Sequence, residues 1–462
     1  MSKIKYTLLL LGILLISNTD VQAADPSVAA PKVTKTETDS VSAESSKDAD
    51  AIAAEDGDRV VTQKELQGLN SEVATLRDQL TRQLDRNIAN TLRSLTIGGT
   101  LQNRYTALTS SNQPPAPNGF TVNAAILSFN GALKKDYDEG KNLTYSLSLI
   151  SSAPTYNVQP YEAYLQYSIF QSLDLEKPTL YFQFGQQSKP FGLEPQVGED
   201  KKPAAIYATF AGPGGFNLAS RDIGIKLRGD LFPHVDTGYN YRVPFIDYAV
   251  ALFNGSGPNA SDTNKSKDVV ARVAFNAPVD YSSDFRGLTF GNSVYSGKKD
   301  LLLGNGTLIT GGTGRASTTR FGQDLSYVSS PIGFTAEYAV GRDEAAISGT
   351  AVANAVKATT QSRGYTFTLF YEWGEQFLTQ YRNQNVYDDW WPKTYQPFLR
   401  FDRWDPNTAV AGNETSILTY GFNFFFAQTT KLQFNYNVSV GKKPNLPNVN
   451  QNTFVAQFQY GF

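Results

Sequence analysis

Lys226 and Arg228 are two cations spaced by two residues, and they alternate with the apolar residues Ile223, Ile225 and Leu227. Successive side chains of a β-strand point to opposite faces, so this spacing places both cations on one face. A cationic row along a narrow aqueous path favours anions, because charge-assisted contacts replace their water. The same alternation predicts inward-facing, pore-lining cations at four further positions: Arg104, Lys134, Arg272 and Arg382.

A second group of charges lies in a connection from Ser188 to Asn217. This segment is longer than usual connections and is rich in glycine and charge, and such loops are more often functional than not. We expect three of its cations to line the pore as well, namely Lys189, Lys201 and Lys202. The alternative is that each inward cation pairs with a lumen carboxylate, such as Asp222, Glu162 or Glu337.

The composition excludes several other kinds of site. The chain has no cysteine and only one histidine, His234, so thiolate chemistry and multi-histidine metal sites are ruled out. An outer-membrane hydrolase would need His234 as its base near the outer rim, whereas the run FPHVDTG predicts a periplasmic turn. A formal net charge of -2 argues against a general nucleic-acid binder. We therefore expect no enzyme, no metal and no cofactor.

The elements that must position these cations are strands. In the last ten residues, Phe454, Ala456, Phe458, Tyr460 and Phe462 share one parity, and mostly polar residues take the other. Comparable alternation recurs through most of the chain after Leu95. This pattern is typical of a barrel wall with lipid outside and water inside. We expect an all-β, transmembrane antiparallel β-barrel over residues 95–462.

Counting the alternating segments gives 17 candidate strands. A barrel with both ends on the periplasmic side needs an even number, so one candidate is wrong. The two weakest are Leu288–Val294 and Phe377–Tyr381. We predict 16 strands and keep 18 as the alternative. Tight turns are expected at 136–141, 329–332 and 427–430, and long loops at 188–217, 296–319 and 342–361.

The first residues indicate export. Lys3 and Lys5 precede the apolar stretch Tyr6–Ile16, and Val21-Gln22-Ala23 is a small-x-small cleavage site, so residues 1–23 are predicted to be a signal peptide. The apolar stretch is too short to span a membrane, and no membrane helix is expected after processing. Residues 24–58 are polar, without aromatics, and are predicted to form a flexible linker.

A helical heptad pattern follows in residues 59–94. Leu66, Leu69, Val73, Leu76 and Leu80 are spaced 3, 4, 3 and 4, and charged residues flank this narrow seam. Such a seam favours association of helices in a coiled coil. The alternative is a lone amphipathic helix on the barrel or the membrane.

Four runs, in order, resemble the phosphate-selective porin O and P family. They are YFQFGQQSKPFGLE (Tyr181–Glu194), SRDIGIKLRGD (Ser220–Asp230), Tyr248–Pro278, and FLRFDRWDP with LTYGFNFFFAQTTKLQFNYN within Phe398–Asn437. The heptad helix resembles the subgroup with an N-terminal coiled coil. The resemblance implies a 16-stranded homotrimeric porin whose third extracellular loop, here 188–217, folds inward and narrows the channel.

These observations predict an outer-membrane porin for passive diffusion of small anionic solutes such as phosphate. Its partners would be the lipid bilayer, the solutes and two further copies of the chain, with the N-terminal helix in the periplasm. The alternative function is structural: the helix and linker would tether the outer membrane to periplasmic partners. The slightly acidic whole chain argues against strong phosphate specificity.

Overall fold

The computed structural model describes residues 94–462 apart from 113–117, 137–139, 171–173, 199–200, 263, 330, 375–393 and 428, together with Val73 and Leu76. The chain divides into two units, Met1–Ala74 and Thr75–Phe462, and the second contains all the strands. Val73 and Leu76 are helical and exposed. The signal peptide, the linker and the rest of the predicted coiled coil lie outside the described residues.

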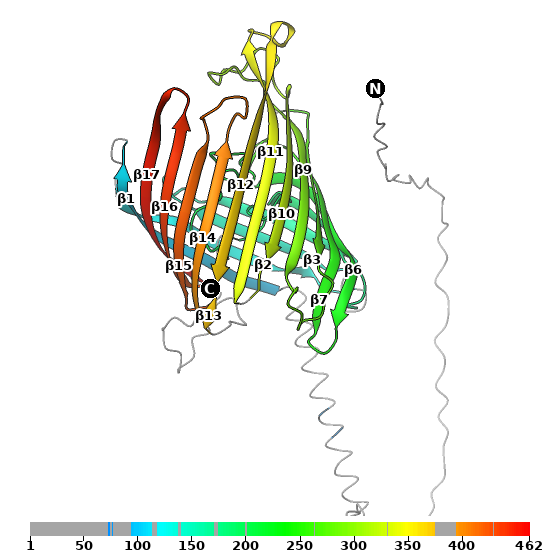
Figure 1. Ribbon diagram of the computed structural model, residues 1–462. Helices are drawn as coiled ribbons and strands as arrows, with labels where there is room; N and C mark the ends of the chain where they lie inside the picture. The colour runs from blue at the N-terminus through cyan, green and yellow to red at the C-terminus, as the bar shows by residue number, and fades with distance from the viewer. Residues whose placement is uncertain are drawn as a thin grey trace, which may run out of the picture. The chain divides into compact units, whose positions relative to one another are not determined.

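The second unit is one antiparallel sheet (Figure 1). Its strands are β1 (Ser94–Ser111), β2 (Gly119–Lys134), β3 (Leu143–Ser151), β4 (Gln159–Phe170), β5 (Leu180–Gln187), β6 (Asp222–Asp236), β7 (Tyr241–Phe253), β8 (Asp268–Asn276), β9 (Leu288–Lys299), β10 (Ala316–Tyr327), β11 (Ile332–Ser348), β12 (Val356–Tyr371), β13 (Trp373–Gly374), β14 (Thr394–Asp405), β15 (Thr415–Phe425), β16 (Lys431–Lys443) and β17 (Leu446–Gly461). A short 3-10 helix, η1 (Val352–Asn354), joins β11 to β12. None of the helices in the described part of the chain is long and apolar enough to cross a membrane.

The sheet closes into a barrel because β1 pairs with both β2 and β17. Backbone hydrogen bonds between Gly99 and Phe462 complete the seam at the C-terminus, with Gly99 N to Phe462 O at 3.0 Å. β12 and the two-residue β13 both pair with β14, so β13 occupies the same place in the barrel as the end of β12. The wall therefore has sixteen strand positions, as predicted.

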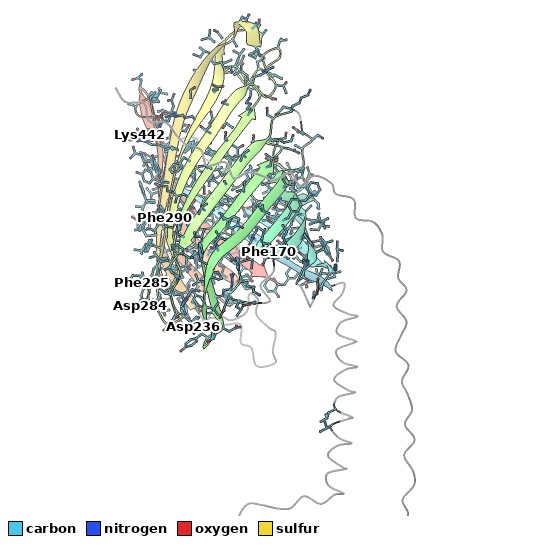
Figure 2. The ribbon with its side chains drawn as sticks, turned by 90° about the vertical axis from the view of Figure 1, so that its right-hand side faces the viewer. Phe170, Asp236, Asp284, Phe285, Phe290 and Lys442 are labelled. Carbon is cyan, nitrogen blue, oxygen red and sulfur yellow. The ribbon has the colours of Figure 1, made fainter. Side chains whose placement is uncertain are left out.

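The two faces of the wall differ as the alternation predicts. On β5, Gln183 is buried, whereas its neighbours Phe182 and Phe184 are 38% and 57% exposed. Phe170 and Phe290 likewise lie on the outer face (Figure 2). A continuous apolar outer face is unfavourable in water but suits acyl chains, whereas buried glutamines require a polar interior.

The two ends of the barrel have different connections. The end that carries the C-terminus is joined mainly by short segments, such as residues 237–240 and 426–430. We call it the turn end; Asp236, Asp284 and Phe285 gather there (Figure 2). The opposite end, the loop end, carries the connection 188–221 between β5 and β6. The C-terminal alternation thus identifies a closing strand rather than the edge of an open sheet.

Of the expected long loops, 342–361 is largely strand, because β11 continues to Ser348 and β12 begins at Val356. The expected loop 296–319 is shorter at both ends, since β9 continues to Lys299 and β10 begins at Ala316, but residues 300–315 still connect the two strands. The backbone pairing persists beyond the apolar alternation, because a polar hairpin can stay paired where water meets both faces. The weak candidate Leu288–Val294 is a true strand within β9, and Phe377–Tyr381 lies outside the described residues.

Candidate functional site

Near its start, at residues 192–194, the β5–β6 loop (residues 188–221) contacts the β9–β11 side of the wall. Gly192 N donates to Ser293 Oγ at 3.0 Å. Leu193 N and Glu194 N donate to the two carboxylate oxygens of Glu337, each at 2.8 Å. These bonds hold the start of the loop against inward-facing side chains of β9 and β11.

Further along, the same loop contacts strands on the other side of the barrel. Its backbone carbonyls between 202 and 206 accept hydrogen bonds from β1, β14, β15 and β16. The donors are Lys431 to Lys202 O at 2.6 Å, Asn423 and Gln433 to Pro203 O at 2.9 Å, Arg104 to Ala205 O at 2.5 Å, and Arg400 to Ile206 O at 2.9 Å. The loop therefore runs through the barrel interior from one wall to the other.

Aromatic residues of the loop fill niches made by glycines in the wall. A Cβ on Gly364 would lie 2.3 Å from Phe210 Cβ, and one on Gly341 would lie 2.5 Å from Phe216 Cε1. Phe210 is 1% exposed and Phe216 7%, and both belong to a buried cluster with Trp404 of β14. Inward-facing glycines thus let the loop pack closely against the sheet.

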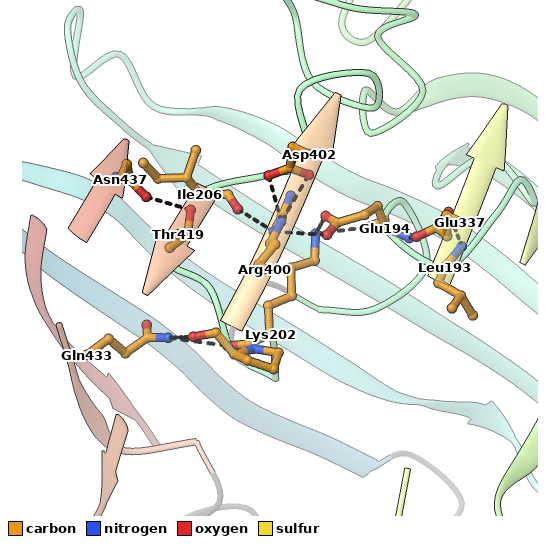
Figure 3. Close-up of polar contacts among 11 residues, drawn as sticks. Leu193, Glu194, Lys202, Ile206, Glu337, Arg400, Asp402, Thr419, Gln433 and Asn437 are labelled. Atoms are coloured by element: carbon orange, nitrogen blue, oxygen red, sulfur yellow. Dashed lines mark hydrogen bonds and ion pairs between the residues drawn. The ribbon is translucent and has the colours of Figure 1, made fainter. Parts of the chain in front are cut away.

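A buried ionic network anchors the middle of the loop (Figure 3). We call the group formed by Glu194, Lys202, Glu337, Arg400 and Asp402 the Arg400 network. Arg400 Nη1 lies 3.3 Å from Glu194 Oε1, and Lys202 Nζ lies 2.9 Å from Glu194 Oε2. Arg400 Nε also contacts Asp402 at 2.9 Å. Burial alone would raise the pKa of Glu194, but Arg400 and Lys202 hold that pKa below its usual value.

Cavities lie between the loop and the wall. One of them, of about 680 Å³, includes three cations from the loop and β1 in its lining, Arg104, Lys202 and Arg221. None of its described lining residues is a carboxylate. Glu162 pairs with Arg221 at 3.2 Å, and neither it nor Glu194 is among those lining residues. The surface of this cationic cavity therefore carries cationic groups, and the carboxylates that pair with Lys202 and Arg221 lie outside its described lining.

Two of these cations also lie over aromatic rings. Arg221 Cζ is 3.8 Å from the centroid of Tyr161, and Lys202 Nζ is 3.5 Å from that of Tyr207. Such contacts favour a fixed position of the cationic group while leaving its charge in place. The rings thus help to hold positive charge at the cavity surface.

A second cavity, about 360 Å³, lies toward the turn end and has mixed charge. Its lining contains Lys226, Arg228 and Arg272 together with Asp230 and Asp247. This mixed cavity is therefore less positive than the cationic cavity.

The predicted cations Lys226, Arg228 and Arg272 lie together around the mixed cavity but have different surroundings. Lys226 is buried and donates to Ser188 O at 3.2 Å. Arg272 forms a bidentate pair with the buried Asp324. Arg228 is exposed, 5.8 Å from the ring centroid of Tyr181.

The remaining predicted cations are spread more widely. Lys189 is 7% exposed and faces a smaller cavity, of about 130 Å³. Lys201 is exposed on the loop. Lys134 is exposed at the last position of β2, after a register shift that follows Ala132. Arg382 lies outside the described residues.

Several interior cations escaped the sequence analysis. Arg221, Arg320 and Arg400 were not among the expected pore residues, although Arg400 and Asp402 alternate with apolar neighbours in the run FLRFDRW as Lys226 and Arg228 do. Parity could have identified Arg400. Arg221 immediately precedes β6, where no alternation pattern defines its direction.

The sequence matches no protein-family model and no curated protein sequence. Among solved structures, the chain is similar to the anion-selective porin from Comamonas acidovorans, with a TM-score of 0.53 and 10% identity over 80% of this chain and 100% of that chain. It is also similar to Salmonella typhi OmpF in a complex with daunomycin, with a TM-score of 0.52 and 12% identity over 80% of this chain and 98% of that chain. The chain therefore has the fold of these porin barrels.

Proposed function

We propose that the chain is an outer-membrane porin through which small anionic solutes, including phosphate-sized ones, diffuse passively. The observation that carries this proposal is the cationic cavity of about 680 Å³, whose described lining has three cations and no carboxylate. In a water-filled space with low-dielectric walls, such a surface raises the local concentration of anions and lowers that of cations.

The β5–β6 loop is proposed to set the narrowest part of the channel. Its backbone is bonded to opposite walls, through Glu337 of β11 and Arg400 of β14. The loop divides the interior into the cationic cavity and the mixed cavity. A solute entering at the loop end would pass the cationic cavity first, so we propose that selection occurs there.

The orientation and assembly are proposed from the two ends and the N-terminal sequence. Short connections and the C-terminus suit the periplasmic side, and the loop end suits the outside. The heptad positions from Leu66 to Leu80 support a periplasmic coiled coil that holds a homotrimer. Deleting residues 24–93 is expected to abolish trimers on non-denaturing gels while single-channel conductance remains; retained trimers would contradict this role of the helix.

Reversal potentials in planar bilayers test the selectivity. In a potassium chloride gradient, the wild-type channel is expected to prefer chloride, and Arg104→Glu is expected to reduce the anion/cation permeability ratio. A charge change at short range in a hydrated pore is worth about 1 kcal/mol or more, which is about fivefold. Lys298→Glu is the matched control. Lys298 is exposed and lies three positions after the buried, inward-facing Tyr295 on β9, so its side chain is on the opposite, outer face of the strand. Equal ratios for wild type and Arg104→Glu would reject the cationic cavity as the selective element.

A further inference from the structure

A pocket of about 200 Å³ lies on the outer face of the barrel wall, away from the lumen. We call it the outer pocket; its lining is Tyr338 of β11, Arg363 and Tyr365 of β12, and Arg403 and Asp405 of β14. The alternate positions Gly364 and Trp404 pack with Phe210 of the β5–β6 loop inside the barrel. The five lining residues therefore point to the outside.

Strand register brings the lining residues together. Tyr338 is opposite Tyr365, which is opposite Arg403 across the next ladder. Arg363 is likewise opposite Asp405, nearer to the loop end. Directly opposite side chains on one face of an antiparallel pair have Cβ atoms about 4.5–5.5 Å apart. Two tyrosine rings and two guanidiniums thus meet on one patch of the wall.

The outer pocket lies at one edge of the apolar band of the wall. Between it and the turn end, Phe367 and Leu369 of β12 are 45% and 43% exposed on the outer face. Trp373 and Tyr395 stack at the turn end, with ring centroids 5.6 Å apart. From Trp373 back to Arg363 the chain advances about ten positions, which at about 3.3 Å each and a tilt of roughly 40° rise about 25 Å. That is the height of the apolar band of such barrels, so Arg363 lies at the level of the lipid headgroups.

The cations at this level are more exposed than the carboxylates beside them. Arg363 Nε lies 3.3 Å from Asp405 Oδ2, but the Arg363 side chain is 50% exposed and the Asp405 side chain 9%. Arg403 donates to Glu414 at 3.1 Å, with exposed fractions of 36% and 11%. Lys442, toward the loop end (Figure 2), pairs with the same Glu414 oxygen at 2.8 Å, so one carboxylate serves two cations. The patch therefore presents positive charge to the outside.

Arg363 keeps donors available for a ligand. Within the described part of the chain its guanidinium makes no hydrogen bond, and its one ion pair is that with Asp405. A guanidinium carries five N–H donors in a planar fork that fits the oxygens of a phosphate. A water molecule occupies about 30 Å³ in the liquid, so a pocket of about 200 Å³ has room for a phosphate group with part of the glycerol or sugar attached to it.

We propose that the outer pocket binds the phosphate-bearing headgroup of an anionic lipid, whose acyl chains lie along the apolar wall toward the turn end. Arg363 and Arg403 bind the phosphate oxygens, and Tyr338 and Tyr365 flank the start of the chains. A second copy of the chain is a poorer occupant, because its apolar wall would bury these guanidiniums without an anion. The proposal requires a barrel in a bilayer but not the proposed selectivity, because the pocket faces away from the lumen.

Native mass spectrometry of the purified full-length protein in a non-ionic detergent tests the site. Phosphatidylglycerol is the probe, and phosphatidylcholine is the comparison, because the two arginines repel its choline cation. We expect preferential binding of phosphatidylglycerol, weakened about fivefold by Arg363→Gln and further by Arg363→Gln/Arg403→Gln, because each cation near a headgroup contributes a similar amount. Arg315→Gln is the charge-matched control and should bind as the wild type does. Arg315 is exposed in the β9–β10 connection at the loop end and does not line the pocket.

Asp405→Asn gives a change in the opposite direction. It removes the carboxylate that competes for Arg363 while keeping a side chain of the same shape, so phosphatidylglycerol should bind more tightly than to the wild type. A purely structural role of the Arg363 and Asp405 pair would not produce this gain. Heat-modifiable gel migration verifies that each variant is folded.

Three results would overturn the lipid site. The first is equal binding of the two lipids by the wild type, or equal affinity for phosphatidylglycerol in Arg363→Gln and Arg315→Gln. The second is displacement of the lipid by millimolar inorganic phosphate, which would indicate a site for the free ion. The third is a wild-type oligomer that binds no lipid and falls apart in the double variant, which would indicate that a second copy covers the pocket. Single-channel conductance of Arg363→Gln in planar bilayers should equal that of the wild type, so failure of the lipid site leaves the channel proposal intact.

Discussion

The cationic cavity and the Arg400 network both contain interior cations, but they use them differently. In the network, Arg400 faces the carboxylates of Glu194 and Asp402 and bonds to the loop backbone at Ile206. In the cationic cavity, Arg104 faces the lumen and bonds to the neutral Gln457 and to Ala205 O. The first arrangement fixes the loop, and the second presents charge to a solute. A cation's role therefore depends on where its carboxylate lies.

The largest expected effect comes from breaking the Arg400 network. Arg400→Met would leave Glu194 and Asp402 buried with less compensation, and removing one partner of a buried pair costs roughly 3–5 kcal/mol. We expect the barrel to lose its heat-resistant gel band at a lower temperature and the loop to detach, which would raise single-channel conductance. Arg363→Met is the control, because Arg363 pairs with Asp405 at 3.3 Å but its side chain is half exposed. Unchanged conductance in folded Arg400→Met would contradict the anchoring role.

The next effect concerns the niches in the wall. Gly364→Ala would place a methyl group 2.3 Å from Phe210 Cβ, where the backbone rather than a flexible side-chain end must move. Overpacking of this kind costs about 1–3 kcal/mol, so the temperature of the gel shift should fall. Gly214→Ala, in the β5–β6 loop that carries Phe210 and with open space around its Cβ, should have no effect. If the two alanine variants melt alike, the packing of Phe210 against β12 is not as described.

The sequence was sufficient to predict the strands of the barrel wall, but it was insufficient to predict the partners of the charged side chains in the interior. The period-two alternation, for example Phe182 and Phe184 against Gln183, predicted the strands, because lipid and water impose opposite polarity on the two faces. The alternation gave 17 candidates, and the even number that barrel closure requires reduced them to sixteen. It could not separate Arg272, which is neutralised by Asp324 on β10, from Lys226, which meets a loop carbonyl. Those partners are 52 and 38 positions away in the chain, so only the folded barrel brings them together.

The glycine niches and the surroundings of Lys189 also lay beyond sequence reasoning. Gly364 and Phe210 come from β12 and from the loop, and no spacing in the sequence relates them. Lys189 was expected to line the pore because it is a cation in a charged loop, but only the folded structure shows that it is 7% exposed and lines a small cavity together with Asp222. Local pattern thus predicts which face a residue takes, and tertiary contacts determine what that residue does.

A smaller effect separates neutralised from unneutralised cations in the mixed cavity. Lys226→Gln removes one positive charge and should lower the anion/cation permeability ratio a few-fold, about 1 kcal/mol. The double variant Arg272→Gln/Asp324→Asn removes a pair and leaves the net charge of the lumen unchanged, so its ratio should equal that of the wild type. Reversal potentials of the two variants, measured in the same salt gradient, make the comparison. A larger shift in the double variant would show that Arg272 acts on solutes despite its carboxylate.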